Sequence, residues 1–534
     1  MALQQHIAAY GDKLLAAFFL LLLFLHLSHS SAHIEGASLP HMTSDASEIA
    51  GKSYDYIVVG GGTAGCPLAA TLSEKYSVLV VERGGSPYGN PWITEKLFYG
   101  FSLLQTDEFT SVAQAFVTED GVQCHRGRVL GGSTAINGGF YSRASGDFVR
   151  RVGWDEELVK EAYEWVESEV VSKPELTMWQ AVVEFGLLEA GILPYNGFTW
   201  EHVEGTKIGG STFDAWGKRH TSADLLQMGN PENITVLLNA TVKSIIFNGS
   251  GDGNKTIARG ITFISSSGDG NQTYDYEAYL NHHGGDVILS AGALGSPQIL
   301  LLSGIGPETH LSQLGIPVVL NSSKVGHGMK DNPGIALLVD SKPESRFPDA
   351  PQVAGITKGF EFIVEGGILP VSFNTTRIPV AVKLAFPESK GKLELNTTDP
   401  RRNPVVSFNY LKKDRDMDQC VKMAQLLKRV AGSPSVAIFL GYVPQNKNFF
   451  LSSSDEEMRE FCRKNVRTFY HYHGGCGVGS VVDEDYRVYG VDGLRVVDGS
   501  TFLESPGTNP MATLLMLGRY QGVEILRERG EVSY

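Results

Sequence analysis

Three glycines near the beginning of the chain have the spacing of a phosphate-binding turn. Gly60, Gly62 and Gly65 follow the pattern G-x-G-x-x-G. The first glycine permits a tight turn, the second lets a pyrophosphate approach the backbone, and the third lets a helix pack on a strand. Glu82 stands 22 residues after Gly60, where a carboxylate accepts hydrogen bonds from the hydroxyls of an adenosine ribose. This combination predicts a dinucleotide-binding site.

Apolar runs on both sides of the glycines predict the elements that position them. Residues 56–59 read as a buried strand, a helix follows from about residue 65, and residues 78–81 read as a second strand that ends at Glu82. The phosphates of a dinucleotide would face the free N–H groups of the new helix. An ordinary strand-to-helix crossover also uses glycine in its turn, but the flanking strand and Glu82 favour a cofactor. The spacing alone does not separate NAD from FAD.

Two later segments repeat this strand, turn and helix form. Residues 286–290 read as a strand, 291–297 as a turn and 298–303 as a helix, while a strand over 494–499 precedes a helix that begins at Pro510. Alternating residues over 235–242 and 258–264 predict further strands. We therefore expect an α/β fold with a discontinuous Rossmann-like domain and an interleaved substrate domain on a mostly antiparallel sheet. The expected boundaries are 52–165, 230–330 and 480–530 for the first domain, and 166–229 and 331–479 for the second.

Composition places the chain among globular proteins of more than one domain. It has 534 residues, of which 42% are hydrophobic and 19% charged, and that length is enough for a sizeable core. Its formal net charge of -14 argues against nucleic acid or an anionic membrane as a partner. We expect a small-molecule substrate and no metal site.

The N-terminal residues have the pattern of a secretory signal. Lys13 precedes an apolar run over 14–25, and polar residues follow over 28–32. The run is shorter than the roughly 20 residues of a spanning helix, so residues 1–32 are predicted to be a cleaved signal peptide, with a signal anchor as the alternative. Eight N-x-S/T sequons accompany it, at Asn233, Asn239, Asn248, Asn254, Asn271, Asn321, Asn374 and Asn396. We expect a secreted glycoprotein, extracellular or vacuolar, with no membrane insertion after cleavage.

Five cysteines are too few for a disulfide scaffold in a chain of this length. Cys66 lies in the first predicted helix and Cys476 in a glycine-rich segment, which favours small buried groups. Cys420 and Cys462 flank a polar stretch and are the favoured pair for a bridge. Cys124 has no assignment.

Two long motifs carry a resemblance to a known family. Residues 127–137, GRVLGGSTAIN, with Tyr141 shortly after, and residues 292–306, GALGSPQILLLSGIG, resemble the two signatures of the glucose-methanol-choline flavoprotein oxidoreductases. The similarity runs from about residue 54 to residue 529. Residues 65–76 and 471–476 are most similar to the plant branch of (R)-mandelonitrile lyases and HOTHEAD-like proteins.

The resemblance implies FAD as the cofactor. Glycines at 131 and 132 would let backbone donors approach the pyrophosphate or the flavin, where side chains would clash, and residues 137–140 would lie against the isoalloxazine ring. The residues that we expect to contact FAD are Gly60, Gly62, Thr63, Ala64, Gly65, Glu82, Arg83, Val129, Gly132, Ser133, Asn137, Gly138, Gly139, Phe140, Val242, Tyr470, Asp498, Gly499, Pro510 and Met511.

The resemblance also implies a catalytic pair, His471 and Asn509. The family places a His at the first position and a His or Asn at the second, just before the last cofactor helix. A neutral imidazole can accept the proton of an alcohol, while an amide only holds the oxygen. Hydride would pass from the carbon to the flavin. His473 lies two residues on, so in an extended segment it points to the opposite face; we expect it and Phe469 near the substrate, with His471 as the base.

Two other functions remain open from the sequence. In mandelonitrile lyases a histidine removes the cyanohydrin proton while FAD stays unreduced. This chain has Asn509 where those lyases usually carry His, and Phe469 where they usually carry Tyr, which puts lyase activity in doubt. The region from Asp340 to Leu384 is also shorter than in relatives, so a non-enzymatic flavoprotein is a third hypothesis. We expect an apolar or aromatic alcohol as substrate and a monomer.

Overall fold

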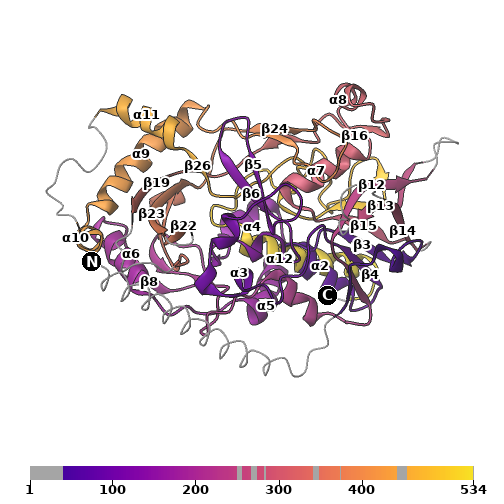
Figure 1. Cartoon of the computed structure of the whole chain (residues 1–534), viewed down its shortest axis with the longest axis horizontal. Helices are drawn as coiled ribbons and strands as arrows, with labels where there is room; N and C mark the ends of the chain where they lie inside the picture. Colours follow the sequence, from indigo (N-terminus) through magenta and orange to yellow (C-terminus); the bar gives the residue numbers. More distant parts are fainter. Residues whose placement is uncertain are drawn as a thin grey trace, which may run out of the picture. The chain divides into compact units, whose positions relative to one another are not determined.

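The computed structural model describes residues 40–248, 255–265, 274–281, 284–340, 348–372, 375–441 and 454–532, and Figure 1 shows the course of the chain. The predicted signal segment, residues 1–32, lies outside these residues, as do the sequons at Asn254, Asn271 and Asn374. Within the described ranges no helix combines the length and apolar character that a bilayer crossing needs.

Six short strands form a parallel sheet around the first glycine turn. In spatial order they are β1 (His41–Thr43), β11 (Ile234–Leu237), β4 (Val78–Val81), β3 (Tyr56–Val59), β15 (Asp286–Leu289) and β28 (Leu494–Val496). All neighbouring pairs run parallel. Strands β3 and β4 are buried throughout, as their continuous apolar runs predict. The three predicted strand-turn-helix segments therefore meet in one sheet, and the predicted α/β fold class is confirmed.

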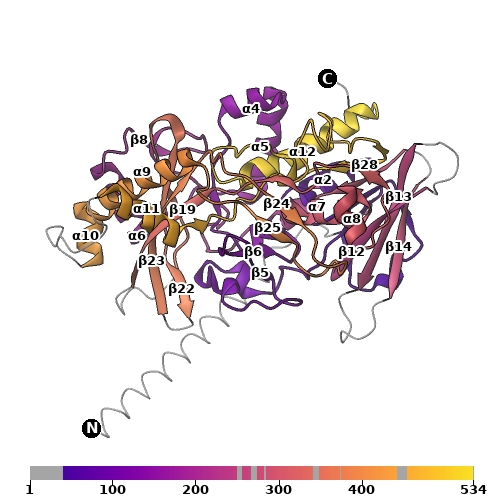
Figure 2. The same cartoon turned by 90° about the horizontal axis from the view of Figure 1, so that it is seen from above.

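Small residues bring the last helix onto the first. Helix α12 (Met511–Glu528) packs against α2 (Gly65–Leu72), and α5 (Glu156–Val170) also packs on α12; Figure 2 shows the three helices side by side. A Cβ at Gly518 would lie 2.2 Å from the carbonyl oxygen of Ala64, and one at Gly522 would lie 2.6 Å from Cβ of Thr71. The two glycines thus set how closely α12 approaches α2, Gly518 at the start of α2, where the glycine turn ends, and Gly522 near its end.

A larger, mostly antiparallel sheet lies beside the first. Its strands, in spatial order, are β26 (Arg467–Thr468), β19 (Pro333–Asp340), β23 (Thr375–Leu384), β21 (Phe362–Gly366), β20 (Val353–Ile356), β9 (Gly205–Ile208) and β8 (Tyr195–Phe198), and β22 (Leu369–Ser372) pairs with β23. Only β8 and β9 pair in parallel. Helices α6 (Met178–Glu189) and α9 (Asp414–Ala431) pack on it, with α10 (Pro434–Leu440) and α11 (Asp455–Asn465) next to them (Figure 1).

A third sheet contains the strands predicted after residue 234. It consists of β12 (Ala240–Phe247), β13 (Thr256–Ser265), β14 (Asp275–Leu280) and β2 (Ser53–Tyr54), with β27 (Val491–Asp492) paired to β13. The single run predicted over 235–242 is divided between β11 and β12. Asn239, with φ of 54°, makes the break, and Asn is one of the few non-glycine residues that adopt this conformation readily.

The second predicted turn is wrong. Residues 291–297 do not form a turn before a helix at 298–303, because helix α7 already begins at Gly292 and runs to Leu302 with Pro297 inside it. Its first turn is held from outside: the N–H of Gly292 donates to the carboxylate of Asp498 at 2.9 Å, and the N–H of Ala291 donates to the hydroxyl of Ser296 at 3.0 Å. A partner 206 residues away cannot be read from local sequence.

Cys420 in α9 and Cys462 in α11 form a disulfide bond, as predicted. It joins two helices that cover the larger sheet. Cys66, Cys124 and Cys476 are free and buried, which agrees with the role predicted for the first and last of them and leaves Cys124 as a buried thiol.

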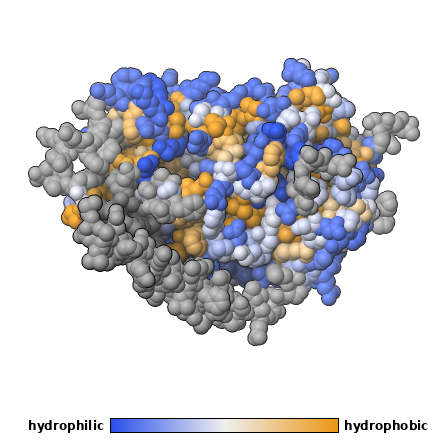
Figure 3. Space-filling view, viewed as in Figure 1, coloured by the Kyte–Doolittle hydropathy of each residue, from blue (hydrophilic) through white to orange (hydrophobic). Residues whose placement is uncertain are grey.

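Hydrophilic and hydrophobic residues are interspersed on the face shown in Figure 3. Large apolar side chains that are well exposed come from separate elements, among them Met178, Trp216 and Ile438. Single exposed apolar residues are normal on a soluble protein. They do not define an interface, and the monomeric state stays a prediction.

Candidate active site

A cavity of about 820 Å³ lies between the parallel sheet and the larger antiparallel sheet. It brings together segments from the whole length of the chain. The predicted site residues that line it are Gly60, Gly62, Thr63, Ala64, Glu82, Arg83, Gly132, Ser133, Asn137, Gly138, Gly139, Phe140, Val242, Phe469, Tyr470, His471, Asp498, Gly499, Asn509, Pro510 and Met511. Gly65, Val129 and His473 do not line it.

Two glycine turns form one end of the cavity, where backbone approaches backbone. Gly60 has φ of 103°, and a Cβ there would lie 2.5 Å from the carbonyl oxygen of Ser290. A Cβ at Gly132 would lie 2.8 Å from Cα of Gly62. Gly65 is needed for packing instead, since its Cβ would lie 2.0 Å from the carbonyl oxygen of Gly60. Side chains at these positions would collide with the neighbouring backbone and force the two turns apart.

Glu82 stands at the end of β4 with its carboxylate buried beside this cradle. One oxygen accepts the N–H of Gly61 at 3.1 Å, and the other accepts the N–H of Gly84 at 2.9 Å. Burial raises the pKa of this carboxyl, and the neighbouring Arg83 and the backbone donors oppose that rise. A carboxylate has about four lone-pair sites, so two remain for ribose hydroxyls.

The carboxylate of Asp498 connects the first turns of two helices. One carboxylate oxygen accepts from the N–H of Gly292 and the hydroxyl of Ser296, at the first turn of α7. The other accepts the N–H of Ser500 at 2.7 Å and caps the 3-10 helix η7 (Gly499–Thr501). Burial raises the pKa of Asp498, and these donors oppose the rise. Asp498 lines the cavity, but both of its carboxylate oxygens already accept hydrogen bonds from other residues of the chain.

Hydrogen bonds position both the backbone and the ring of His471. Its N–H donates to the carboxylate of Asp331 at 2.9 Å, and its ring Nδ1 lies 3.2 Å from Oδ1 of Asn332. The amide nitrogen of Asn332 donates to the carbonyl oxygens of Leu384 and Ala385 at 2.8 and 2.7 Å. Oδ1 of Asn332 must therefore accept, so Nδ1 of His471 carries the proton and Nε2 carries the lone pair.

The surroundings of His471 keep its ring neutral. Burial lowers the pKa of the imidazole well below its usual range, and the charge of Lys383, with that of His473 when that ring is protonated, lowers it further. Its side chain is only 8% exposed, and the cavity is where it meets open space. A neutral ring whose unprotonated nitrogen faces a cavity is a general base in its working form.

Asn509 precedes helix α12 and is oriented by a buried ion pair. Nζ of Lys383 donates to Oδ1 of Asn509 and to Oε1 of Glu365, the latter at 3.2 Å. Burial lowers the pKa of the Lys383 ammonium, while Glu365 raises it. Because Oδ1 of Asn509 is occupied, the amide N–H groups are left to donate to an oxygen in the cavity.

Phe469 and His473 have different surroundings. The Phe469 ring lies 6.0 Å from the ring of His471, with Nζ of Lys383 5.1 Å from its centre. His473 points away from the cavity, as the two-residue spacing predicts for one of the pair. Its Nδ1 lies 2.9 Å from the carbonyl oxygen of His471, and burial lowers its pKa to about 4. His473 thus supports the His471 backbone, and its predicted place near the substrate is not observed.

Four residues that position the pair escaped the sequence analysis: Asp331, Asn332, Glu365 and Lys383. The signal for Lys383 was a lysine inside the otherwise apolar end of a predicted strand region, next to Val382 and Leu384. Such a residue is almost never fully buried without a partner. Nothing local pointed to Glu365 as that partner, since it lies on the neighbouring strand.

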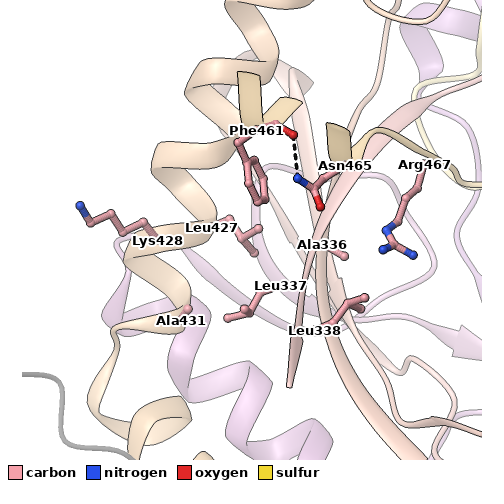
Figure 4. Close-up of a pocket in the computed structure, with 9 residues that line it drawn as sticks. All are labelled: Ala336, Leu337, Leu338, Leu427, Lys428, Ala431, Phe461, Asn465 and Arg467. Carbon is pink, nitrogen blue, oxygen red and sulfur yellow. Dashed lines mark hydrogen bonds between the residues drawn. The ribbon is translucent and has the colours of Figure 1, made fainter. Parts of the chain in front are cut away.

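A second, smaller cavity of about 200 Å³ adjoins the first (Figure 4). Apolar side chains of α9, α11 and β19 line it, including Leu337, Leu427 and Phe461. Ala336, Leu338, Asn465 and Arg467 line both cavities. The two cavities therefore share part of their walls.

The ion pair between Lys383 and Glu365 gives a stability prediction. Lys383→Met should lower the free energy of unfolding by about 3–5 kcal/mol, because it leaves the Glu365 carboxylate buried without its cation. The double variant Lys383→Met/Glu365→Leu should recover much of that loss. Urea unfolding measures both, with Lys358→Met at an exposed lysine as the control. A double variant less stable than the single one would contradict this account of the pair.

Solved structures and characterised relatives agree with this architecture. A formate oxidase of Aspergillus oryzae superposes with a TM-score of 0.75 at 19% identity, over 90% of this chain and 99% of that one. A pyridoxine 4-oxidase of Mesorbium loti gives 0.75 at 20%, over 90% and 100%. At such identities these similarities concern the fold. Protein HOTHEAD of Arabidopsis thaliana is 44% identical, over 90% of this chain and 89% of its own length.

Two other relatives have named activities. A sinapyl alcohol oxidase of Nesocodon mauritianus is 42% identical over 95% of this chain and 94% of its own length. (R)-Mandelonitrile lyase 2 of Prunus dulcis is 41% identical, also over 95% and 94%. The family model for the N-terminal part of GMC oxidoreductases matches residues 54–334, and that for the C-terminal part matches 387–518. The resemblance seen in the two motifs is thereby confirmed, FAD is supported as the group for which the glycine cradle is built, and the chain belongs to the GMC oxidoreductase family.

Proposed function

We propose that this protein is an FAD-dependent oxidoreductase that oxidises the CH–OH group of an apolar or aromatic alcohol. The observation that carries the proposal is the state of His471: a buried, neutral imidazole that lines the cavity and whose Nδ1–H is fixed by Asn332, which leaves Nε2 as the acceptor. In that tautomer the ring removes the hydroxyl proton of an alcohol. FAD, when bound, supplies the acceptor for the hydride that leaves the carbinol carbon.

Asn509 is the partner of His471 in this proposal. Lys383 occupies its Oδ1, so its N–H groups donate to the alcohol oxygen and hold it between the amide and the imidazole. Negative charge that develops on that oxygen is stabilised by preoriented donors in a site shielded from water. The amide cannot take up a proton itself, so His471 is the only proton acceptor of the pair.

The lining of the cavity supports an apolar or aromatic substrate. On the side of the larger sheet it includes the apolar side chains of Ile335, Leu338, Pro351 and Phe469, beside polar groups such as Glu365 and Arg467. Such walls bind a hydrocarbon part of the substrate through burial of apolar surface. The activity named for the relative from Nesocodon mauritianus, oxidation of an aromatic alcohol, is of this class.

Cleavage of a cyanohydrin is the second candidate function. The ammonium of Lys383 at Asn509 is a positive charge close to the proposed substrate oxygen, which would favour a departing anion. The carboxylate of Glu365, however, lies 3.2 Å from that ammonium and offsets its field. We therefore rank oxidation first.

A secreted location is also part of the proposal. It is supported by the disulfide between Cys420 and Cys462, since such bonds persist mainly in oxidising compartments. Asn239, Asn321 and Asn396 are sequons within the described residues. Protein made in a plant secretory host should lose apparent mass on endoglycosidase digestion. An unchanged gel mobility would argue against glycosylation and this location.

Reduction of the flavin tests the oxidation directly. Purified protein mixed anaerobically with benzylic and cinnamylic alcohols should lose its yellow absorbance. His471→Ala should slow that reduction by about 10²- to 10⁴-fold, the usual contribution of a general base, while FAD stays bound. His327→Ala, at an exposed histidine, is the control. Persistent colour with every alcohol, together with cyanide release from mandelonitrile, would favour the lyase.

The pH dependence of kcat/KM tests the state of His471. Because its pKa is lowered, the ring stays unprotonated in acid, and the acid limb should lie below the ordinary histidine value of about 6.5. Asn332→Asp places a carboxylate beside Nδ1, which favours the protonated ring, so the limb should move to higher pH. Asn332→Ala should lower kcat/KM without that upward move. An acid limb at 6.5 or above in the unchanged enzyme would contradict the assignment.

A further inference from the structure

Arg126 is a buried cation with an unused hydrogen-bond donor at the cavity wall. It lies in strand β6 (Gln123–Gly127), is 8% exposed, and lines the large cavity. Its Nε donates to Oε1 of Gln114 at 3.2 Å, while its Nη2 is buried and has no hydrogen-bond partner. A buried guanidinium nitrogen normally has an acceptor, so this one requires an explanation.

The charge of Arg126 is also uncompensated. Among the ion pairs of the described residues, none includes Arg126, and burial together with the cations Arg83 and Arg128 lowers the pKa of its guanidinium. Arg128 is paired with Asp107 at 3.2 Å. Arg83 donates to Gln114 and to the carbonyl oxygen of Gly127, at 2.6 and 2.9 Å. A buried charge without a partner costs several kcal/mol, so an anion is expected opposite Arg126.

The position of Arg126 indicates which anion this is. Its Nη1 lies 3.9 Å from the place that a Cβ at Gly295 would occupy, beside the first turn of α7. The next residue, Gly127, packs on Gly132: a Cβ at Gly127 would lie 2.5 Å from the backbone carbon of Gly132. The guanidinium of Arg126 thus lies near the first turn of α7, and the strand that carries it ends against the glycine cradle. Helix starts carry positive partial charge, which adds to that of the arginine.

We infer that Arg126 pairs with the diphosphate of bound FAD. The diphosphate is the only charged group of oxidised FAD at neutral pH, and the same cavity contains the glycine turns built for it. The inference rests on the FAD part of the proposed function but not on the identity of the substrate. It adds a residue to the cofactor site that the spacing of the glycines does not reveal.

Cofactor affinity, measured without turnover, tests this role. Apoprotein is titrated with FAD and, separately, with riboflavin, which lacks the diphosphate, and binding is followed by quenching of flavin fluorescence. Arg126→Met should raise the Kd for FAD about 10- to 100-fold, the effect of losing a hydrogen bond to a charged group. Arg126→Lys should retain most of the affinity. Riboflavin affinity should be equal in all variants.

Arg128→Met is the matched control, because Arg128 is also mostly buried but does not line the cavity. This variant should leave the Kd for FAD within about twofold.

An unchanged Kd for FAD in Arg126→Met would overturn the inference. An equal loss of riboflavin affinity, or a change confined to the KM of an anionic substrate, would overturn it as well. If neither Arg126 variant folds, inorganic pyrophosphate must raise the melting temperature of the unaltered apoprotein; no rise would also overturn it. Loss of alcohol oxidation at unchanged FAD affinity would instead count against the proposed function.

Discussion

The hydrogen bond between His471 and Asn332 is the interaction on which the proposed chemistry depends. The two backbone carbonyls that accept from the Asn332 amide nitrogen fix the orientation of this amide, so that its oxygen lies at the ring of His471. That oxygen fixes the proton of His471 on Nδ1, and burial keeps the ring neutral. The proposed base is therefore oriented with the help of strand β23, because Leu384 at its end supplies one of the carbonyls. The orientation of His471 thus depends on the larger antiparallel sheet and not on the parallel sheet.

The glycine cradle for the cofactor depends on the absence of side chains and not on hydrogen bonds between them. Gly60 and Gly132 each occupy a position where a Cβ would collide with backbone. Gly518 lets α12 approach α2, and the same helix begins just after Asn509. The packing of α12 on α2 therefore links the cofactor cradle to Asn509, the second member of the proposed catalytic pair. A change in the contact between α12 and α2 would therefore alter the positions of both the glycine cradle and Asn509.

Local sequence predicted what depends on short-range spacing. The turn at Gly60, the strand ending at Glu82 and the start of α12 after Pro510 all follow from motifs a few residues long. The start of α7 was missed because its cap, Asp498, comes from the far end of the chain. Lys383, Glu365 and Asn332 were missed for the same reason, since their partners are set by strand pairing and not by spacing.

Nitrogen-15 NMR of histidine-labelled protein, with the His471 signals assigned by comparison with His471→Asn, addresses the central claim most directly. The account predicts a neutral ring between pH 5 and 8 with the chemical shifts of a protonated Nδ1 and an unprotonated Nε2. A ring that takes up a second proton near pH 6.5, or one that carries its single proton on Nε2, would contradict it.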